Sequence, residues 1–192
     1  MQTTYPRTRR WTRTEYDNLI DKGVFQPGER LELLAGQLVV REPQGDPHSL
    51  AVELVNEALR SAFGPDWRVR VQLPVALDAE SEPEPDVSVA AGRVQGGAEA
   101  KPSRLALVVE VSASSLALDR EHKGSLYARA GVPEYWIVNL NDRVLEVYRE
   151  PGPHASAPYG WAYRAIHTLR SEDHVTPLAA PTARLAVADL LP

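Results

Sequence analysis

Two acidic residues stand at places where the sequence predicts buried strands. Glu110 lies in residues 105–111, a run that is otherwise apolar, and Asp86 directly precedes the apolar segment 87–90. Burying a carboxylate is costly unless it is paired, hydrogen-bonded, protonated or bound to a metal. Because acids at the ends of neighbouring strands can converge, Asp86 and Glu110 predict a site for a hard cation such as Mg²⁺. The alternative is that both acids are solvated at strand ends and pair with local arginines.

Lys123 follows Glu110 on a predicted helix, one turn after Asp119 and one turn before Tyr127. A lysine beside a metal site can orient a water and neutralise the charge that grows on a phosphate. The alternative is an ordinary surface pair between Asp119 and Lys123, which would contribute only about 0.3–0.5 kcal/mol. Lysine is rare in this chain, at three of 21 basic residues, which favours a specific role.

Two further residues, His48 and Glu32, could supply another ligand or proton acceptor. The simpler interpretation is that His48 is exposed at the start of a helix and that Glu32 faces solvent from a strand. The chain has no cysteine, which excludes disulfides, thiolate nucleophiles and cysteine-based zinc sites. It also has no glycine-rich phosphate loop, dinucleotide fingerprint or nucleophile elbow.

The composition is that of a globular protein, with 43% hydrophobic and 24% charged residues among 192. This length favours a single domain over residues 1–192, with its core over about 12–170. The net charge of -5 argues against a protein that coats nucleic acid through bulk positive charge. A local basic patch could still contact phosphates, and the arginines around Trp11 or on residues 68–70 are candidates, with a solvated tail and sheet face as the alternative.

The N-terminal residues resemble no secretory signal, and the longest apolar runs are far too short to span a membrane. We therefore expect a cytoplasmic protein without a membrane partner.

Capping signals and periodicity predict the helices that position these residues. Thr12 and Glu15 have capping-box spacing, which predicts a short helix that ends at Gly23. A longer helix begins at Asp46-Pro47, where Asp46 can accept first-turn N–H groups, and it ends before Gly64. A third helix spans about 118–130 and stops at Gly131.

The remaining segments predict strands. Residues 30–34 and 37–40 form a predicted hairpin, and further strands are expected at 67–73, 87–90, 105–111, 135–138, 144–148 and 161–166. Loops are expected around Gly92, Gly96 and Gly97 and over residues 150–160, which are rich in Pro and Gly. This order of elements predicts an α/β fold of the α+β type, a mixed sheet flanked by helices.

Several segments also carry the pattern of a known family. They are residues 31–33 with Gly36, His48 at a helix start, 84–87 (Glu-Pro-Asp-Val), 107–112 (Leu-Val-Val-Glu-Val-Ser), and Asp119, Arg120 and Lys123 leading into 127–138 (Tyr-Ala-Arg-Ala-Gly-Val-Pro-Glu-Tyr-Trp-Ile-Val). Together they resemble the Uma-two family of bacterial restriction endonucleases, a branch of the PD-(D/E)xK nuclease-like fold. The resemblance runs from about residue 12 to the end.

The resemblance implies a restriction-endonuclease-like core in which Asp86 and Glu110 hold Mg²⁺ or Mn²⁺, with the backbone carbonyl of Val111 as a further ligand. Ser112 stands where that fold usually has its lysine, and Lys123 matches the lysine that replaces it on the following helix. The metal would activate water and polarise the phosphate, while Lys123 stabilises the transition state.

These residues and the resemblance predict a Mg²⁺-dependent endonuclease that hydrolyses DNA. The alternatives are a non-catalytic module that keeps the fold for protein binding or assembly, and an enzyme acting on RNA or nucleotides. Two departures from the family pattern, Ala35 and Asn139, leave the proposed metal pair untouched. A two-fold homodimer is the default expectation for a protein of this kind.

Overall fold

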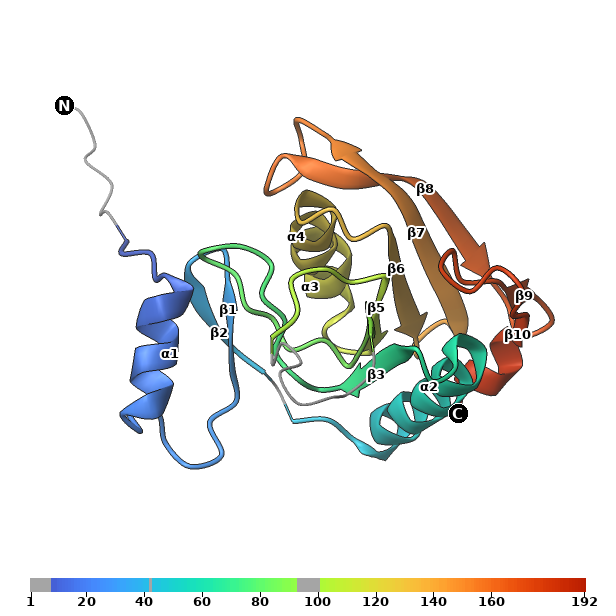
Figure 1. Cartoon of the computed structure of the whole chain (residues 1–192), viewed down its shortest axis with the longest axis horizontal. Helices are drawn as coiled ribbons and strands as arrows, with labels where there is room; N and C mark the ends of the chain where they lie inside the picture. Colours follow the sequence, from blue (N-terminus) through green and yellow to red (C-terminus); the bar gives the residue numbers. More distant parts are fainter. Residues whose placement is uncertain (1–7, 42, 93–100) are drawn as a thin grey trace.

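A computed structural model describes residues 8–41, 43–92 and 101–192. Within these residues six strands form one sheet in the order β3-β4-β5-β6-β7-β8 (Figure 1). The strands are β3 (Trp67–Val71), β4 (Val87–Ala91), β5 (Leu107–Ser112), β6 (Glu134–Asn139), β7 (Val144–Pro153) and β8 (Trp161–Leu169). β5 and β6 pair in parallel and the other neighbours pair antiparallel, which confirms the predicted mixed sheet.

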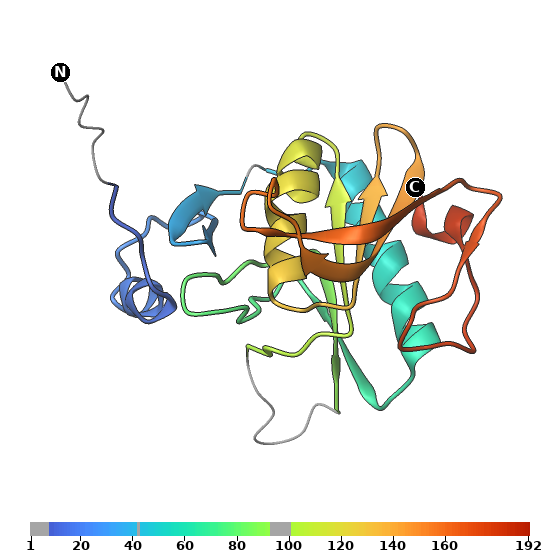
Figure 2. The ribbon, with the colours of Figure 1, turned by 90° about the horizontal axis from the view of Figure 1, so that it is seen from above.

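Helical segments cover both faces of this sheet (Figure 2). On one face lies α2 (Asp46–Phe63), together with the short 3-10 helix η2 (Val187–Leu190), whose Val187 and Leu190 belong to the same core cluster. On the other face, α3 (Leu116–Leu118), the π-helix η1 (Asp119–Lys123) and α4 (Gly124–Arg129) form one continuous helical segment. Tyr127 and Ala128 of α4 anchor the core cluster of that second face.

The alternation of side chains along β5 decides where Glu110 points. Leu107, Val109 and Val111 pack in the core cluster on the α2 face, whereas Val108 packs in the cluster on the α4 face. Since successive side chains of a strand point to opposite faces, Glu110 shares the α4 face with Val108. Glu110 therefore lies on the face of the sheet that packs against the helical segment carrying Lys123.

The N-terminal part adds α1 (Arg13–Asp21) and the hairpin β1 (Leu31–Leu34) with β2 (Gln37–Val40), at one end of the molecule (Figure 1). The predicted capping box of α1 is present, with Thr12 and Glu15 exchanging hydrogen bonds. Ala35 and Gly36 both have positive φ, as the tight primed turn of a two-residue hairpin requires. Leu34 of the hairpin packs against Leu126 of α4, which joins this end to the main sheet.

Two local predictions, for the cap of α2 and for the start of a loop at residue 150, were wrong, and the third predicted helix is present with a local irregularity. Gly45, not Asp46, is the cap residue of α2, and no side-chain cap bond forms there. The third helix, predicted at about 118–130, is confirmed over residues 116–129, and it contains the π-turn η1. Residues 150–153 continue β7 instead of starting a loop, and they pair with β8. They lie beyond the last residue pair between β7 and β6. The prolines in this stretch therefore remove no hydrogen bond between β7 and β6.

Other segments refine or fall outside the predictions. In β3, Arg70 is buried as well as Val69, so the strand does not have a single buried face. A small pair of strands near the C-terminus, β9 (His174–Val175) with β10 (Leu185–Ala186), was not predicted. The predicted loop around Gly96 and Gly97 lies outside the described residues.

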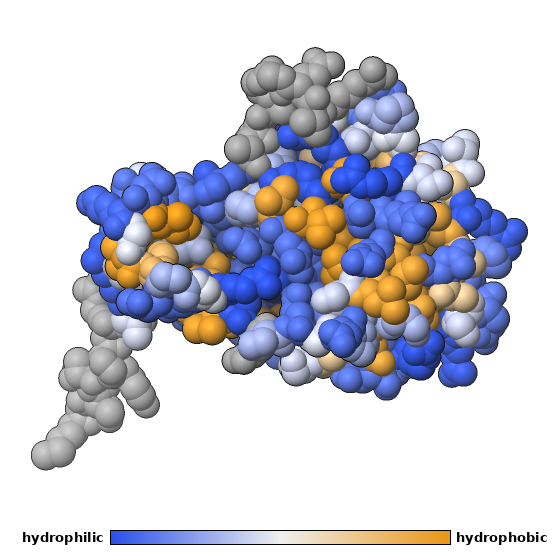
Figure 3. All heavy atoms as spheres, turned by 90° about the horizontal axis from the view of Figure 1, so that it is seen from below, coloured by the Kyte–Doolittle hydropathy of each residue, from blue (hydrophilic) through white to orange (hydrophobic). Residues whose placement is uncertain are grey.

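Exposed apolar side chains are spread over several elements, among them Val40, Leu50 and Leu73. Seen from below, hydrophobic residues gather over part of the main body, with hydrophilic residues between them (Figure 3). Among the described residues, no helix combines the length and the apolar character needed to cross a bilayer.

Candidate active site

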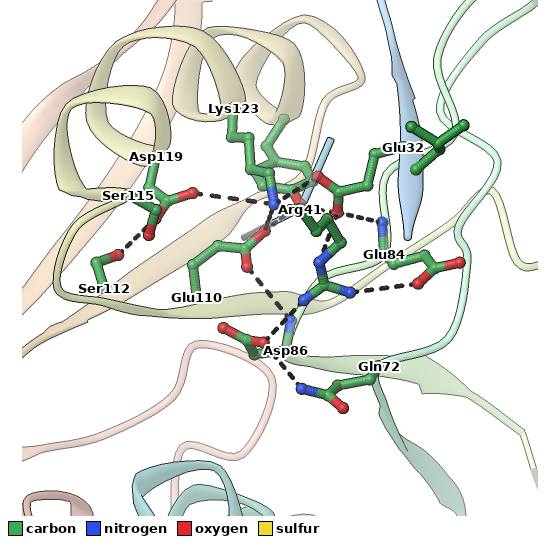
Figure 4. Close-up of polar contacts among 12 residues, drawn as sticks. Glu32, Arg41, Gln72, Glu84, Asp86, Glu110, Ser112, Ser115, Asp119 and Lys123 are labelled. Carbon is green, nitrogen blue, oxygen red and sulfur yellow. Dashed lines mark hydrogen bonds and ion pairs between the residues drawn. The ribbon is translucent and has the colours of Figure 1, made fainter. Parts of the chain in front are cut away.

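The predicted site residues line one cavity of about 330 Å³, which we call the pocket. The hairpin, the start of α2, the residue before β4, the end of β5 and the π-turn all contribute to its wall. Figure 4 shows the acids and the lysine of this site pointing toward one another. From the sequence predictions it contains Glu32, His48, Asp86, Glu110, Val111, Asp119 and Lys123. Tyr127 is buried beneath it and reaches Glu110.

Asp86 lies just before β4 and is 2% exposed. Its Oδ2 accepts a hydrogen bond from the backbone N–H of Val111 at 2.9 Å and lies 3.0 Å from His48 Nε2. Its Oδ1 accepts from Arg41 Nη2 at 3.2 Å and from the side-chain amide of Gln44 at 3.3 Å. Burial alone would raise the pKa of Asp86, but the contact with His48 and the Val111 amide outweigh it, so the pKa is lowered.

Glu110 is the central acid of the pocket. Its Oε1 accepts from Lys123 Nζ at 3.0 Å and from the Tyr127 hydroxyl at 2.7 Å. Its Oε2 accepts from the backbone N–H of Asp86 at 3.3 Å, which ties the two acids directly together. Burial raises the pKa of Glu110 to about 8, and Lys123 only partly offsets this effect because Asp119 and other acids add to it.

Lys123 is buried with acids on three sides. Its Nζ lies 3.0 Å from Glu110 Oε1, 3.1 Å from Glu32 and 3.9 Å from Asp119 Oδ1. Burial alone would lower the pKa of Lys123, but the charges of Glu110 and Glu32 raise it well above its ordinary value. The side chain is therefore a protonated ammonium, fixed at the wall of the pocket.

The π-turn that carries Lys123 is anchored through Asp119. Asp119 Oδ2 accepts hydrogen bonds from Ser112 Oγ at 2.7 Å and Ser115 Oγ at 2.6 Å. Its backbone carbonyl accepts from the Tyr135 hydroxyl at 3.1 Å and from the Gly124 N–H, the wider bond of a π-turn. Single π-turns are frequent at functional sites. Here the turn directs Lys123 toward Glu110.

Three of the simpler alternatives from the sequence were wrong. Glu32 is 1% exposed and does not face solvent, and its Oε1 also accepts from the backbone N–H of Glu84 at 2.8 Å. His48 is buried against Asp86. Asp119 and Lys123 are both buried, so they do not form a surface pair. These corrections share one cause: the hairpin and α2 fold over the strand ends, which sequence spacing alone does not reveal.

Three polar residues that surround Asp86 were not predicted from the sequence. Arg41, Gln44 and Gln72 all direct side-chain nitrogens at its Oδ1. Arg41 and Gln44 belong to the connection between β2 and α2, and Gln72 follows β3. No periodic pattern or motif marks such loop residues, so only the tertiary structure brings them to the site.

The charges and donors of the pocket fit a hard divalent cation. Among the described residues, no three His, Asp or Glu side chains converge as a complete ligand set. Mg²⁺, however, is commonly held by one or two carboxylates with waters. Within the described residues four buried acids, Glu32, Asp86, Glu110 and Asp119, stand against two buried cations, Arg41 and Lys123, and burial together with this crowding of acids raises the pKa of Glu110. Such an excess of buried acids favours a bound cation.

Comparison with known proteins agrees with this architecture. A crystal structure described as a putative nuclease from Anabaena variabilis matches with a TM-score of 0.68 and 16% sequence identity, covering 94% of this chain and 97% of that one. At this identity the match establishes the fold alone, an α/β fold with a mixed sheet.

The family follows from the sequence itself. Residues 13–188 match the Uma2 family, whose description is "Putative restriction endonuclease". The chain belongs to the Uma2 family, as the resemblance in its motifs predicted. No curated protein matches the chain.

Proposed function

We propose that the protein is a Mg²⁺- or Mn²⁺-dependent endonuclease that hydrolyses DNA phosphodiester bonds in the pocket. The observation that carries this proposal is the meeting of Asp86, Glu110 and Lys123, from three separate elements, in one cavity with an excess of buried acids. Membership of a family described as restriction endonucleases supports the reaction class. Fold and family alone do not fix an activity, so the site itself must be tested.

Asp86 and Glu110 would hold the cation, with the backbone carbonyl of Val111 as a third protein ligand. When bound, the cation polarises a phosphate oxygen and lowers the pKa of a bound water. Asp86 is oriented for this role by the Val111 amide and His48, and Glu110 by the Tyr127 hydroxyl. Tyr127 and His48 are thus positioning residues in this proposal.

Lys123 would stabilise the negative charge that develops on the phosphate. Its ammonium is already desolvated, and the carboxylates around it keep it protonated. A preorganised charge in a water-poor site is worth about 10²–10³ in rate when it faces the charge that forms in the transition state. Glu32 and Asp119 both lie beside the Lys123 ammonium and would act as positioning residues for it.

The experiment is a cleavage assay with duplex DNA, single-stranded DNA and RNA, in Mg²⁺, Mn²⁺ or chelator, at low and high salt. We expect duplex DNA to be cut only with a divalent cation, and Asp86→Asn and Glu110→Gln to lower the rate at least about 100-fold. Glu53→Gln, which neutralises an exposed acid on α2, should retain the wild-type rate.

Equal cleavage by wild type and Asp86→Asn would contradict the proposal. Cleavage of RNA in place of DNA would keep the site and change the substrate class. If the wild type binds no divalent cation and cuts none of the substrates, the non-catalytic alternative holds: the protein keeps the fold for protein binding or assembly. The predicted homodimer remains a separate prediction, which light scattering of the purified chain would check.

A further inference from the structure

Arg41 is a positively charged residue whose side chain is buried among the acids of the pocket. It directly follows β2, and its side chain is only 7% exposed. Its guanidinium lies among three carboxylates: Nη2 is 3.2 Å from Asp86 Oδ1, Nη1 is 3.2 Å from Glu84 Oε2, and Nε is 3.9 Å from Glu32 Oε1 (Figure 4). Arg41 therefore contacts the same carboxylate that the proposed function assigns to the metal.

The oxygen that Arg41 contacts is already saturated with donors. Asp86 Oδ1 also accepts from the side-chain amides of Gln44 at 3.3 Å and Gln72 at 3.4 Å, and these two amides hydrogen-bond to each other. A carboxylate oxygen has about two lone-pair sites. A cation can therefore use this oxygen only when some of these donors withdraw.

Arg41 differs from the two glutamines in how it meets a cation. A glutamine amide can rotate and present its oxygen, so Gln44 and Gln72 can turn from donors into acceptors. A guanidinium has no acceptor atom and keeps its charge at any pH at which proteins fold. Arg41 thus opposes a cation at Asp86 both through its charge and through the site that it fills.

We propose that Arg41 is an exchangeable counter-ion whose guanidinium competes with the divalent cation for Asp86, and so sets the metal affinity of the pocket. This inference rests on the proposed function, because it takes Asp86 as a metal-binding carboxylate. Glu84, whose side chain is 29% exposed, gives the displaced guanidinium a second carboxylate at the edge of the pocket. Arg41 neutralises Asp86 until a cation takes its place.

The test is isothermal titration of Mn²⁺ into the full chain and its variants, with no substrate present. Arg41→Gln removes the charge and should bind Mn²⁺ at least about tenfold more tightly, since a unit charge a few ångströms from a divalent ion acts strongly in a part-buried site. Arg41→Lys keeps the charge and should stay within about threefold of the wild type. Arg104→Gln removes an exposed arginine as the control for net charge and should leave the affinity unchanged.

Circular dichroism first establishes that each variant is folded. If Arg41→Gln does not fold, the pair Glu84→Gln and Glu84→Gln/Arg41→Gln repeats the comparison, with the double variant at the wild-type net charge. The double variant should then bind Mn²⁺ more tightly than Glu84→Gln alone.

The outcomes separate the two proposals. If the wild type binds Mn²⁺ and removal of Arg41 leaves the affinity equal or weaker, Arg41 is no competitor and this inference fails while the metal site stands. If only the Arg41 variant binds, the competition between Arg41 and the cation is supported, but the wild-type pocket excludes the cation and the proposed metal-dependent activity is contradicted. If neither protein binds Mn²⁺, the metal site itself fails, and the inference fails with it.

Discussion

Two regions of this molecule bury acidic side chains, and they differ in how many cations accompany those acids. Away from the pocket, Glu134 at the start of β6 is fully buried. Its Oε1 accepts from Arg149 Nη2 at 2.6 Å and from the Trp136 indole N–H at 3.0 Å, and its Oε2 accepts from the Leu178 N–H at 2.8 Å. Each oxygen of this acid has a donor, and one arginine neutralises its charge.

Glu146 on β7 follows the same pattern. Arg120 donates two hydrogen bonds to it, and Asn139 and Tyr148 each donate one. Burial alone would raise the pKa of Glu146, but these donors outweigh it and lower the pKa. In the pocket the balance is reversed for Glu110, whose pKa is raised to about 8.

The contrast shows that a buried acid does not by itself mark a functional site. Glu134 and Glu146 are as buried as Asp86 and Glu110. What distinguishes the pocket is the surplus of acids over cations around a cavity, where a mobile cation can enter. Removing one partner of a buried one-to-one pair destabilises the fold, whereas a surplus of buried acids is itself unfavourable for stability and so points to function.

The largest expected effect comes from replacing, one at a time, two positively charged residues of the same π-turn. Lys123→Met should lower DNA cleavage at least about 100-fold, because it removes the charge that faces the phosphate. Arg120→Met, on the neighbouring residue, should keep the rate within about threefold, because Arg120 is part exposed and pairs with Glu146 outside the pocket. Single-turnover rates with Mg²⁺ check this prediction.

An equal loss in both variants would contradict it, because the two residues would then act only through the shape of the π-turn. Arg120→Met also controls for that shape, since it substitutes methionine on the same turn.

The second comparison concerns stability. Glu134→Gln should lower the free energy of unfolding by about 3 kcal/mol, because it breaks a buried, hydrogen-bonded pair with Arg149. That loss corresponds to a fall of about 6–12 °C in Tm for a chain of this size. Glu110→Gln should cost much less, because it removes one acid from a surplus and leaves Lys123 paired with Glu32.

Chemical denaturation in the presence of chelator measures both variants under the same conditions. If Glu110→Gln destabilised the protein as much as Glu134→Gln, the pocket acids would be structural like those of β6 and β7.

Most helices and strands could be predicted from the sequence, whereas only some of the site residues could. Caps and breakers placed α1 and α2 almost to the residue, because Thr12, Pro47 and Gly64 act locally. An isolated acid in an apolar strand singled out Glu110, and helical spacing and the rarity of lysine singled out Lys123, to which the family pattern assigned a role. Arg41 and Gln44 could not be predicted, because they reach Asp86 through loop geometry. Glu134 and Glu146 were not recognised as buried, because their arginine partners lie on other segments.

A third test uses the pH dependence of stability. The folded-state pKa of Glu146 lies below its ordinary value of 4.5, so its ionised form is stabilised by folding. Its contribution is fully present above the unfolded pKa and is lost as the pH falls through the lower folded pKa. The difference in unfolding free energy between wild type and Glu146→Gln should therefore be constant near neutral pH and shrink below about pH 4.5.

Urea denaturation at several pH values, in the range where both proteins are folded, gives this difference directly. A gap that widened in acid would mean that Glu146 is not held as a carboxylate by Arg120. Its pKa would then be raised, as that of Glu110 is, and not lowered.

The smallest effect should come from the hydroxyl that anchors the π-turn. Ser112→Ala removes one of the two serine donors to Asp119 Oδ2, while Ser115 remains. We expect a loss of about 1 kcal/mol in stability and a drop of a few fold in cleavage rate, because Asp119 holds Lys123 less firmly. Ser88→Ala is the matched control, since its buried hydroxyl has no hydrogen-bond partner within the described residues. Equal rates for both variants would mean that Ser112 stabilises the strand end without positioning Lys123.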